Sequence, residues 1–76
     1  MNCYKMNKAS VGQLVYVPSN TTLKKIKNGT VSDYFVTEVP TNVLVLEEVQ
    51  HDKLGIHFNG EKWYVTKKDV YDAKVG

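Results

Sequence analysis

Residues 41–71 read TNVLVLEEVQHDKLGIHFNGEKWYVTKKDVY, and they carry the strongest fold signal in the chain. Three apolar runs are separated by a polar turn and by the dipeptide Asn59-Gly60. Both residues of that dipeptide tolerate positive φ, which a two-residue β-hairpin turn requires. Short apolar runs joined by such turns are typical of consecutive antiparallel strands. This stretch therefore predicts a β-meander that closes into a small barrel.

The strand pattern extends toward the N-terminus. The side chains of residues 11–17 alternate in the pattern of a half-buried strand. Pro18 ends this predicted strand because proline cannot donate to a β-ladder. Residues 18–32 are predicted to form a long loop with a short hairpin or turn inside it, and residues 66–69 one helical turn. The continuous apolar run at 43–46 predicts a strand buried on both faces. The predicted strands span 11–17, 33–39, 43–49, 54–58 and 61–65.

Length and composition predict a single small domain. The chain has 76 residues and a net charge of +2, and a chain this short buries only about 60% of its unfolded surface. Residues 1–10 are predicted to be a flexible N-terminal tail, and residues 11–76 the folded domain. Cys3 is the one cysteine, so no internal disulfide can form. No apolar run approaches the length needed to span a bilayer, and we expect a cytoplasmic protein.

No catalytic or metal-binding pattern is legible. The candidate metal ligands Cys3, His51, Asp52 and His57 do not have the paired short spacings of structural zinc sites. The adjacent carboxylates Glu47-Glu48 point to opposite faces of a strand, whereas a two-carboxylate mechanism needs both across one cleft. We therefore predict a protein that is not an enzyme and that has no metal and no cofactor.

Aromatic residues are the main candidates for a binding surface. Tyr16, Tyr34, Trp63, Tyr64 and Tyr71 exceed what so small a core can hide. Trp63 and Tyr64 are consecutive on one strand, so one of them faces outward, and the sequence does not say which. Such side chains can rest half-buried at a barrel rim, or they can anchor a partner protein. We predict that Tyr16, Tyr34, Trp63 and Tyr64 contact the partner, together with the loop at residues 18–32.

Lysine clusters are the second candidate feature. All ten basic residues are lysine, and arginine, the residue best suited to bidentate phosphate contacts, is absent. Charge runs are usually a solvated face, but lysines can steer a partner protein or give weak, salt-sensitive attraction to phosphate. The residues predicted to form a rim or to contact phosphate are Lys24, Lys25, Lys27, Lys67 and Lys68.

Three segments resemble bacterial SH3 domains: VLVLEE at 43–48, FNG at 58–60 and YVTKK at 64–68. They correspond to that family's apolar strand ending in acidic residues, its hairpin, and its closing strand and turn. The resemblance implies a five-stranded SH3-like barrel. This sequence departs from the family at Lys53-Leu54, where bacterial SH3 domains usually carry Trp-Tyr. It also departs at 66–69, where peptide-binding SH3 domains have proline and tyrosine. The fold therefore transfers better than the function.

Together these features predict an all-β, five-stranded SH3-like barrel with a long loop after the first strand and a short helical turn near the C-terminus. Its predicted function is non-catalytic binding of another protein, as a small accessory or regulatory factor of bacterial or phage origin. The alternative is weak, lysine-mediated binding of nucleic acid. A cell-wall binder ranks third and an enzyme last. No membrane partner is expected, and the oligomeric state and the partner's identity stay open.

Overall fold

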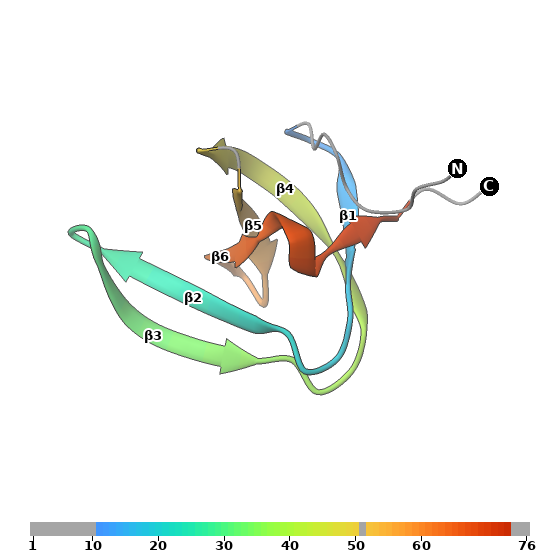
Figure 1. Ribbon diagram of the computed structural model, residues 1–76, viewed down its shortest axis with the longest axis horizontal. Helices are drawn as coiled ribbons and strands as arrows, with labels where there is room; N and C mark the ends of the chain where they lie inside the picture. The colour runs from blue at the N-terminus through green and yellow to red at the C-terminus, as the bar shows by residue number, and fades with distance from the viewer. Residues whose placement is uncertain (1–10, 51, 74–76) are drawn as a thin grey trace.

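The computed structural model describes residues 11–50 and 52–73, and these form one antiparallel sheet of seven strands (Figure 1). The order across the sheet is β3-β2-β6-β5-β4-β1-β7, with β3 and β7 as its two end strands. In the described chain the sheet is therefore not closed, and the five-stranded barrel stays a prediction. The all-β prediction is confirmed, whereas the predicted tail at 1–10 and His51 lie outside the described residues. The elements are β1 (Leu14–Val17), β2 (Thr22–Lys27), β3 (Thr30–Val36), β4 (Thr41–Val49), β5 (Lys53–Phe58), β6 (Glu61–Thr66), the 3₁₀ helix η1 (Lys67–Asp69) and β7 (Tyr71–Asp72).

Two Asn-Gly turns shape the sheet. Asn59-Gly60 joins β5 to β6 with φ of 55° and 78°, as the sequence predicts. Asn28-Gly29 has nearly the same geometry, with φ of 54° and 79°, and joins β2 to β3. The hairpin expected inside residues 18–32 is present, but the long loop predicted around it is wrong, because the two arms of the hairpin are the strands β2 and β3.

The strand bounds differ from the predicted ones by one to three residues. The first strand begins at Leu14 rather than at residue 11, because Gly12 turns the chain with a φ of 93°. The strand predicted to run to residue 39 ends at Val36. Each of the five predicted strands has a counterpart, and β2 and β7 bring the total in the described chain to seven.

The core fills the concave side of the sheet. Val43 and Val45 on β4 are 4% and 0% exposed, whereas Leu44 and Leu46, which alternate with them, are 38% and 36% exposed. The prediction that this strand is buried on both faces is thus wrong, because in the described chain only one face of β4 is covered. The core consists of Val15, Val17, Leu23, Val43, Val45, Leu54, Ile56, Trp63, Val65 and Val70.

The β2–β3 hairpin extends from the rest of the sheet (Figure 1). It pairs with β6 at Lys24 and Tyr64. Two buried threonines hold its base: Thr37 Oγ1 donates to the Pro18 carbonyl at 2.7 Å and accepts from the Thr21 amide at 3.0 Å. Thr21 Oγ1 also donates to the Pro18 carbonyl, at 2.8 Å, so both threonine hydroxyls are hydrogen-bonded and the hairpin is anchored at its open end.

Within the described residues there is no helix with the length and hydropathy that crossing a bilayer requires.

Candidate protein-binding surface

The structure separates the four predicted aromatic contacts. Tyr34 on β3 is 62% exposed and Tyr16 on β1 is 38% exposed. Tyr64 on β6 is half-buried, and Trp63 is 6% exposed. Tyr16 packs against Tyr71, with ring centroids 6.4 Å apart. Four strands lie between β1 and β3 in the sheet order, so Tyr16 and Tyr34 do not share a surface patch.

Trp63 belongs to the core and is covered by the hairpin. The Phe35 ring lies 6.0 Å from its ring, and Lys25 Nζ lies 5.0 Å from the ring centroid. The Trp63 Nε1 atom is buried and has no hydrogen-bond partner among the described residues. The question left open by the sequence is thus answered: Trp63 faces inward and Tyr64 faces outward.

A row of paired residues crosses five strands on the outer face. Tyr34 pairs with Lys24, Lys24 with Tyr64, Tyr64 with Gly55, and Gly55 with Glu47. Residues paired across neighbouring strands project to the same face of a sheet. Of the predicted set, the structure therefore places Tyr34, Lys24 and Tyr64 on one continuous surface.

Glu47 organises the far end of this row. Its Oε2 accepts a hydrogen bond from the Tyr64 hydroxyl at 3.0 Å and lies 2.8 Å from Lys62 Nζ. The hydrogen bond from Lys62, followed by that from Tyr64, lowers the pKa of Glu47 below its ordinary value. The same bond with Glu47 raises the pKa of Lys62. Glu47 reaches both partners by passing over Gly55, where a Cβ would lie 2.9 Å from Glu47 Cγ.

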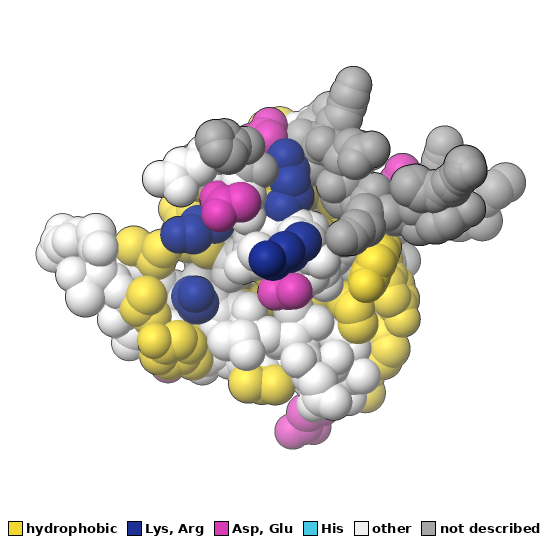
Figure 2. Space-filling model, in the orientation of Figure 1, with side chains coloured by type: hydrophobic (Ala, Val, Ile, Leu, Met, Phe, Trp, Pro, Cys, Tyr) yellow, Lys and Arg dark blue, Asp and Glu magenta, His cyan; other side chains and the backbone are white. Residues whose placement is uncertain are grey.

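Ion pairs neutralise part of the lysine surface. Lys25 Nζ lies 2.7 Å from Glu61 Oε1 and Lys67 Nζ lies 2.8 Å from Glu48 Oε2. The remaining predicted lysines, Lys24, Lys27 and Lys68, form no ion pair within the described part of the chain. Figure 2 shows lysine and acidic side chains intermixed over the middle of one face, with hydrophobic side chains on either side of them.

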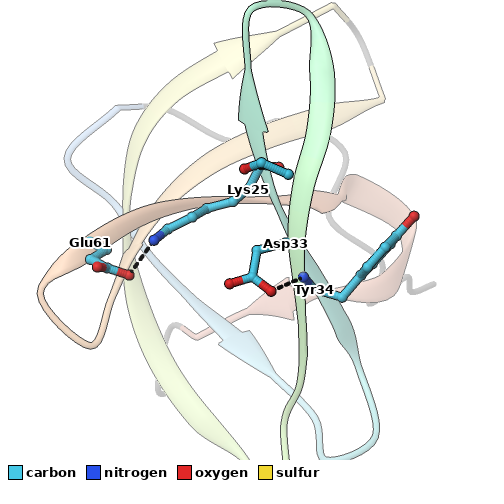
Figure 3. Close-up of polar contacts among 5 residues, drawn as sticks. Lys25, Asp33, Tyr34 and Glu61 are labelled. Atoms are coloured by element: carbon cyan, nitrogen blue, oxygen red, sulfur yellow. Dashed lines mark hydrogen bonds and ion pairs between the residues drawn. The ribbon is translucent and has the colours of Figure 1, made fainter.

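Lys24 and Lys25 project to opposite faces of β2. Lys24 follows Tyr64 on the outer face, whereas Lys25 lies over Trp63 on the inner face, where it points to Glu61 (Figure 3). The lysines at 24–27 therefore do not act as one patch. This separation follows from the alternation of side chains along a strand, which a hairpin imposes and a loop would not.

The most exposed strand is β3, whose seven residues are all exposed. Phe35 is 38% exposed and Val36 50% exposed, and the Phe35 ring lies 5.2 Å from that of Phe58. Phe35, Val36 and Phe58 are absent from the predicted site. Treating Asn28-Gly29 as a hairpin signal would have predicted a strand at residues 30–36, but only the strand order shows that this strand lies at the edge of the sheet.

In residues 11–50 and 52–73, no group of three or more His, Cys, Asp and Glu side chains is placed to hold a metal ion. Comparison with models of protein families, with curated proteins and with solved structures found no match to this chain.

Proposed function

We propose that this domain is a non-catalytic protein-binding module built as an SH3-like barrel. Five strands, β1, β4, β5, β6 and β7, with a 3₁₀ helix between the last two, support that architecture. The β2–β3 hairpin takes the position of the long loop that follows the first strand. We further propose that the role is accessory or regulatory, in the cytoplasm of a bacterium or of a phage-infected cell.

The exposure of β3 carries the functional proposal. Tyr34, Phe35 and Val36 are consecutive, and all three are more than a third exposed. Val31 on the same strand is 37% exposed. Tyr34 and Val36 share one face of β3 and Phe35 lies on the other, so apolar side chains are exposed on both sides of this edge strand. Apolar and aromatic side chains exposed together on a small domain are typical of interaction sites. The partner contact accordingly centres on β3, with Tyr34 as the most exposed anchor.

The pattern of charges favours a protein partner over nucleic acid. Affinity for nucleic acid grows with the number of phosphates that cations neutralise. Glutamates already pair with Lys25, Lys62 and Lys67 in the described structure. Binding of nucleic acid by Lys24, Lys27 and Lys68 is the second candidate, because these lysines carry no ion pair among the described residues.

Capture experiments with matched variants test this proposal. The tagged chain is used to isolate partners from host extract, beside Tyr34→Ala and the control Val11→Ala, which alters a 64% exposed residue outside β3. We expect the wild type and the control to retain one protein that Tyr34→Ala loses. Retention should survive nuclease and moderate salt, because an aromatic contact is little screened.

Two outcomes would contradict the proposal. Capture that disappears with nuclease, or that falls steeply with salt, would favour the nucleic-acid alternative. Capture that is equal for Tyr34→Ala and the wild type would remove β3 from the binding surface. Tyr34→Ala should remain folded because exposed side chains contribute little to stability, and circular dichroism checks this.

A further inference from the structure

The outer edge of β3 has main-chain groups available for another strand. β3 is an end strand of the sheet, and its inner neighbour is β2. At its C-terminal end, the amide of Thr37 donates to the carbonyl of Thr21 on the β2 side. Polar groups of successive residues in an antiparallel strand point to alternate sides. The N–H and C=O groups of Val36 and Tyr34 therefore point away from β2.

One of these edge groups is occupied by the chain itself. The amide of Tyr34 donates to Oδ1 of Asp33 at 2.9 Å (Figure 3). The two side chains project to opposite sides of β3 (Figure 3). The Asp33 carboxylate thus occupies the place that the carbonyl of an added strand would take. A bound strand would take over this amide and release the carboxylate to interact with another group.

A groove of about 400 Å³ lies beside the C-terminal half of β3. The Phe35 and Phe58 rings, 5.2 Å apart, form its aromatic part. Val39, 66% exposed, also lines it. The remaining lining residues are Thr37, Glu38 and Thr41. Phe35 lies on the same face of the hairpin as buried Leu23, with which it is paired. A residue placed opposite Phe35 on an added strand would therefore project toward this groove.

The uncompensated charge beside the groove is acidic. Asp33 and Glu38 form no ion pair with any described residue, whereas the nearby Lys25 is already paired with Glu61. Asp33 precedes Phe35 by two residues and so shares its face. In an antiparallel partner, the residue opposite Asp33 comes two positions after the residue opposite Phe35. A basic side chain there would meet the released Asp33 carboxylate.

We propose that β3 binds an extended peptide as an additional antiparallel strand, with an apolar residue in the Phe35 groove and a lysine or arginine two residues later. This inference rests on the proposed function and specifies its partner. Main-chain hydrogen bonds supply affinity in such strand addition, and side-chain pockets supply specificity. The apolar groove, the free main-chain groups at the β3 edge and the acidic residues Asp33 and Glu38 together favour an extended peptide with an apolar and a basic side chain.

Asp33 has a competing interpretation as an edge guard. Charged side chains on edge strands commonly prevent unwanted pairing between sheets. A pure guard opposes every added strand, so its removal should strengthen pairing with any peptide. In the proposed site Asp33 instead recognises a basic residue, so its effect depends on the charge of the peptide. Reversing the charge at residue 33 and, separately, at the facing residue of the peptide distinguishes these two roles.

Fluorescence anisotropy with synthetic peptides tests the proposal. The parent peptide is a short threonine- and valine-rich strand with a central phenylalanine and a lysine two residues later. A second peptide replaces that lysine by glutamate, and a third is N-methylated at an amide that faces β3. The protein variants are Asp33→Lys and Val36→Pro. Proline at residue 36 removes an edge N–H without removing a bond to β2, so the fold should be kept.

We expect the wild type to bind the parent peptide, and Asp33→Lys to bind it about tenfold more weakly while preferring the glutamate peptide. N-methylation of the peptide and Val36→Pro should each weaken binding about tenfold, because each removes a main-chain hydrogen bond. Val36→Thr, which keeps the N–H, is the matched control and should bind like the wild type.

Three results would overturn the proposal. They are equal binding of the methylated and parent peptides, no binding of the parent peptide up to about 1 mM, and tighter binding of every peptide by Asp33→Lys. Sedimentation of the chain alone adds a further check, since a dimer that Val36→Pro dissociates would show that a second copy occupies the edge. If the peptides fail while partner capture still depends on Tyr34, strand addition is wrong and the proposed function stands.

Discussion

Gly55 lies beneath the Glu47 side chain, and replacing it by alanine tests the geometry of the outer face. A Cβ at this position would lie 2.9 Å from Glu47 Cγ and 3.1 Å from Lys62 Cε. Real Cβ contacts are essentially never that short, so Glu47 must move. Its movement breaks the hydrogen bond from the Tyr64 hydroxyl and the ion pair with Lys62. Gly55→Ala should therefore destabilise the domain.

The expected size follows from the contacts that are lost. A partly buried hydrogen bond to a carboxylate contributes about 1–2 kcal/mol and an exposed ion pair up to about 1 kcal/mol, while glycine-to-alanine replacement restores about 0.4–1 kcal/mol through the unfolded chain. The net loss for Gly55→Ala is about 1–2 kcal/mol. For a chain of 76 residues, each kcal/mol lowers Tm by about 6 °C.

The assay is urea unfolding followed by tryptophan fluorescence, with Gly55→Ala made in the wild type and in Glu47→Ala. Alanine at residue 47 has no Cγ, and Lys62 is then free to move aside. Gly55→Ala should therefore be neutral or stabilising by up to about 1 kcal/mol in that background. An equal cost in both backgrounds would refute the reasoning, because the clash would then not involve Glu47.

Two further predictions concern the core and the Glu47 contacts. Trp63→Ala should cost about 3–5 kcal/mol, measurable by chemical unfolding, because Trp63 is 6% exposed; a loss no larger than that of Tyr34→Ala would contradict its place in the core. The stability difference between the wild type and Glu47→Gln should depend on pH. The pKa of Glu47 is lowered by Lys62 from 4.5, so its contribution is present above pH 4.5 and is lost as the pH falls through the lowered value. The pKa of Lys62 is raised by Glu47 from 10.5, so its contribution is present below pH 10.5 and is lost as the pH rises through the raised value. Between these two pKa values the wild type should be more stable than Glu47→Gln, by less than about 1 kcal/mol because both groups are exposed, and outside them the two proteins should be equally stable. A stability difference that does not depend on pH would show that the charges are not responsible.

Local signals were sufficient for the strand content. Asn59-Gly60 favours a two-residue hairpin turn through its own backbone preferences, because both residues tolerate the positive φ that they adopt here. The alternation before Pro18 and the 3₁₀ turn at 67–69 likewise follow from neighbours in the chain. The same local rule applies to Asn28-Gly29, so the β2–β3 hairpin could have been found without the structure.

The binding surface depended on contacts between distant segments. The alternation at Trp63 and Tyr64 shows that one faces inward, but the β2–β3 hairpin determines which, because Phe35 and Lys25 cover the indole. Likewise, the run at 43–46 is compatible with one or two buried faces, and the described chain covers only one.

The sequence alone established an all-β chain with tight Asn-Gly turns and an apolar centre between residues 41 and 71, because backbone preferences and side-chain alternation are local properties. The exposed edge at β3, the meeting of Phe35 with Phe58, and the pairing of lysines with glutamates required the folded sheet. These features join residues that are far apart in the chain, and their positions follow from which strands become neighbours and which strand is left at the edge.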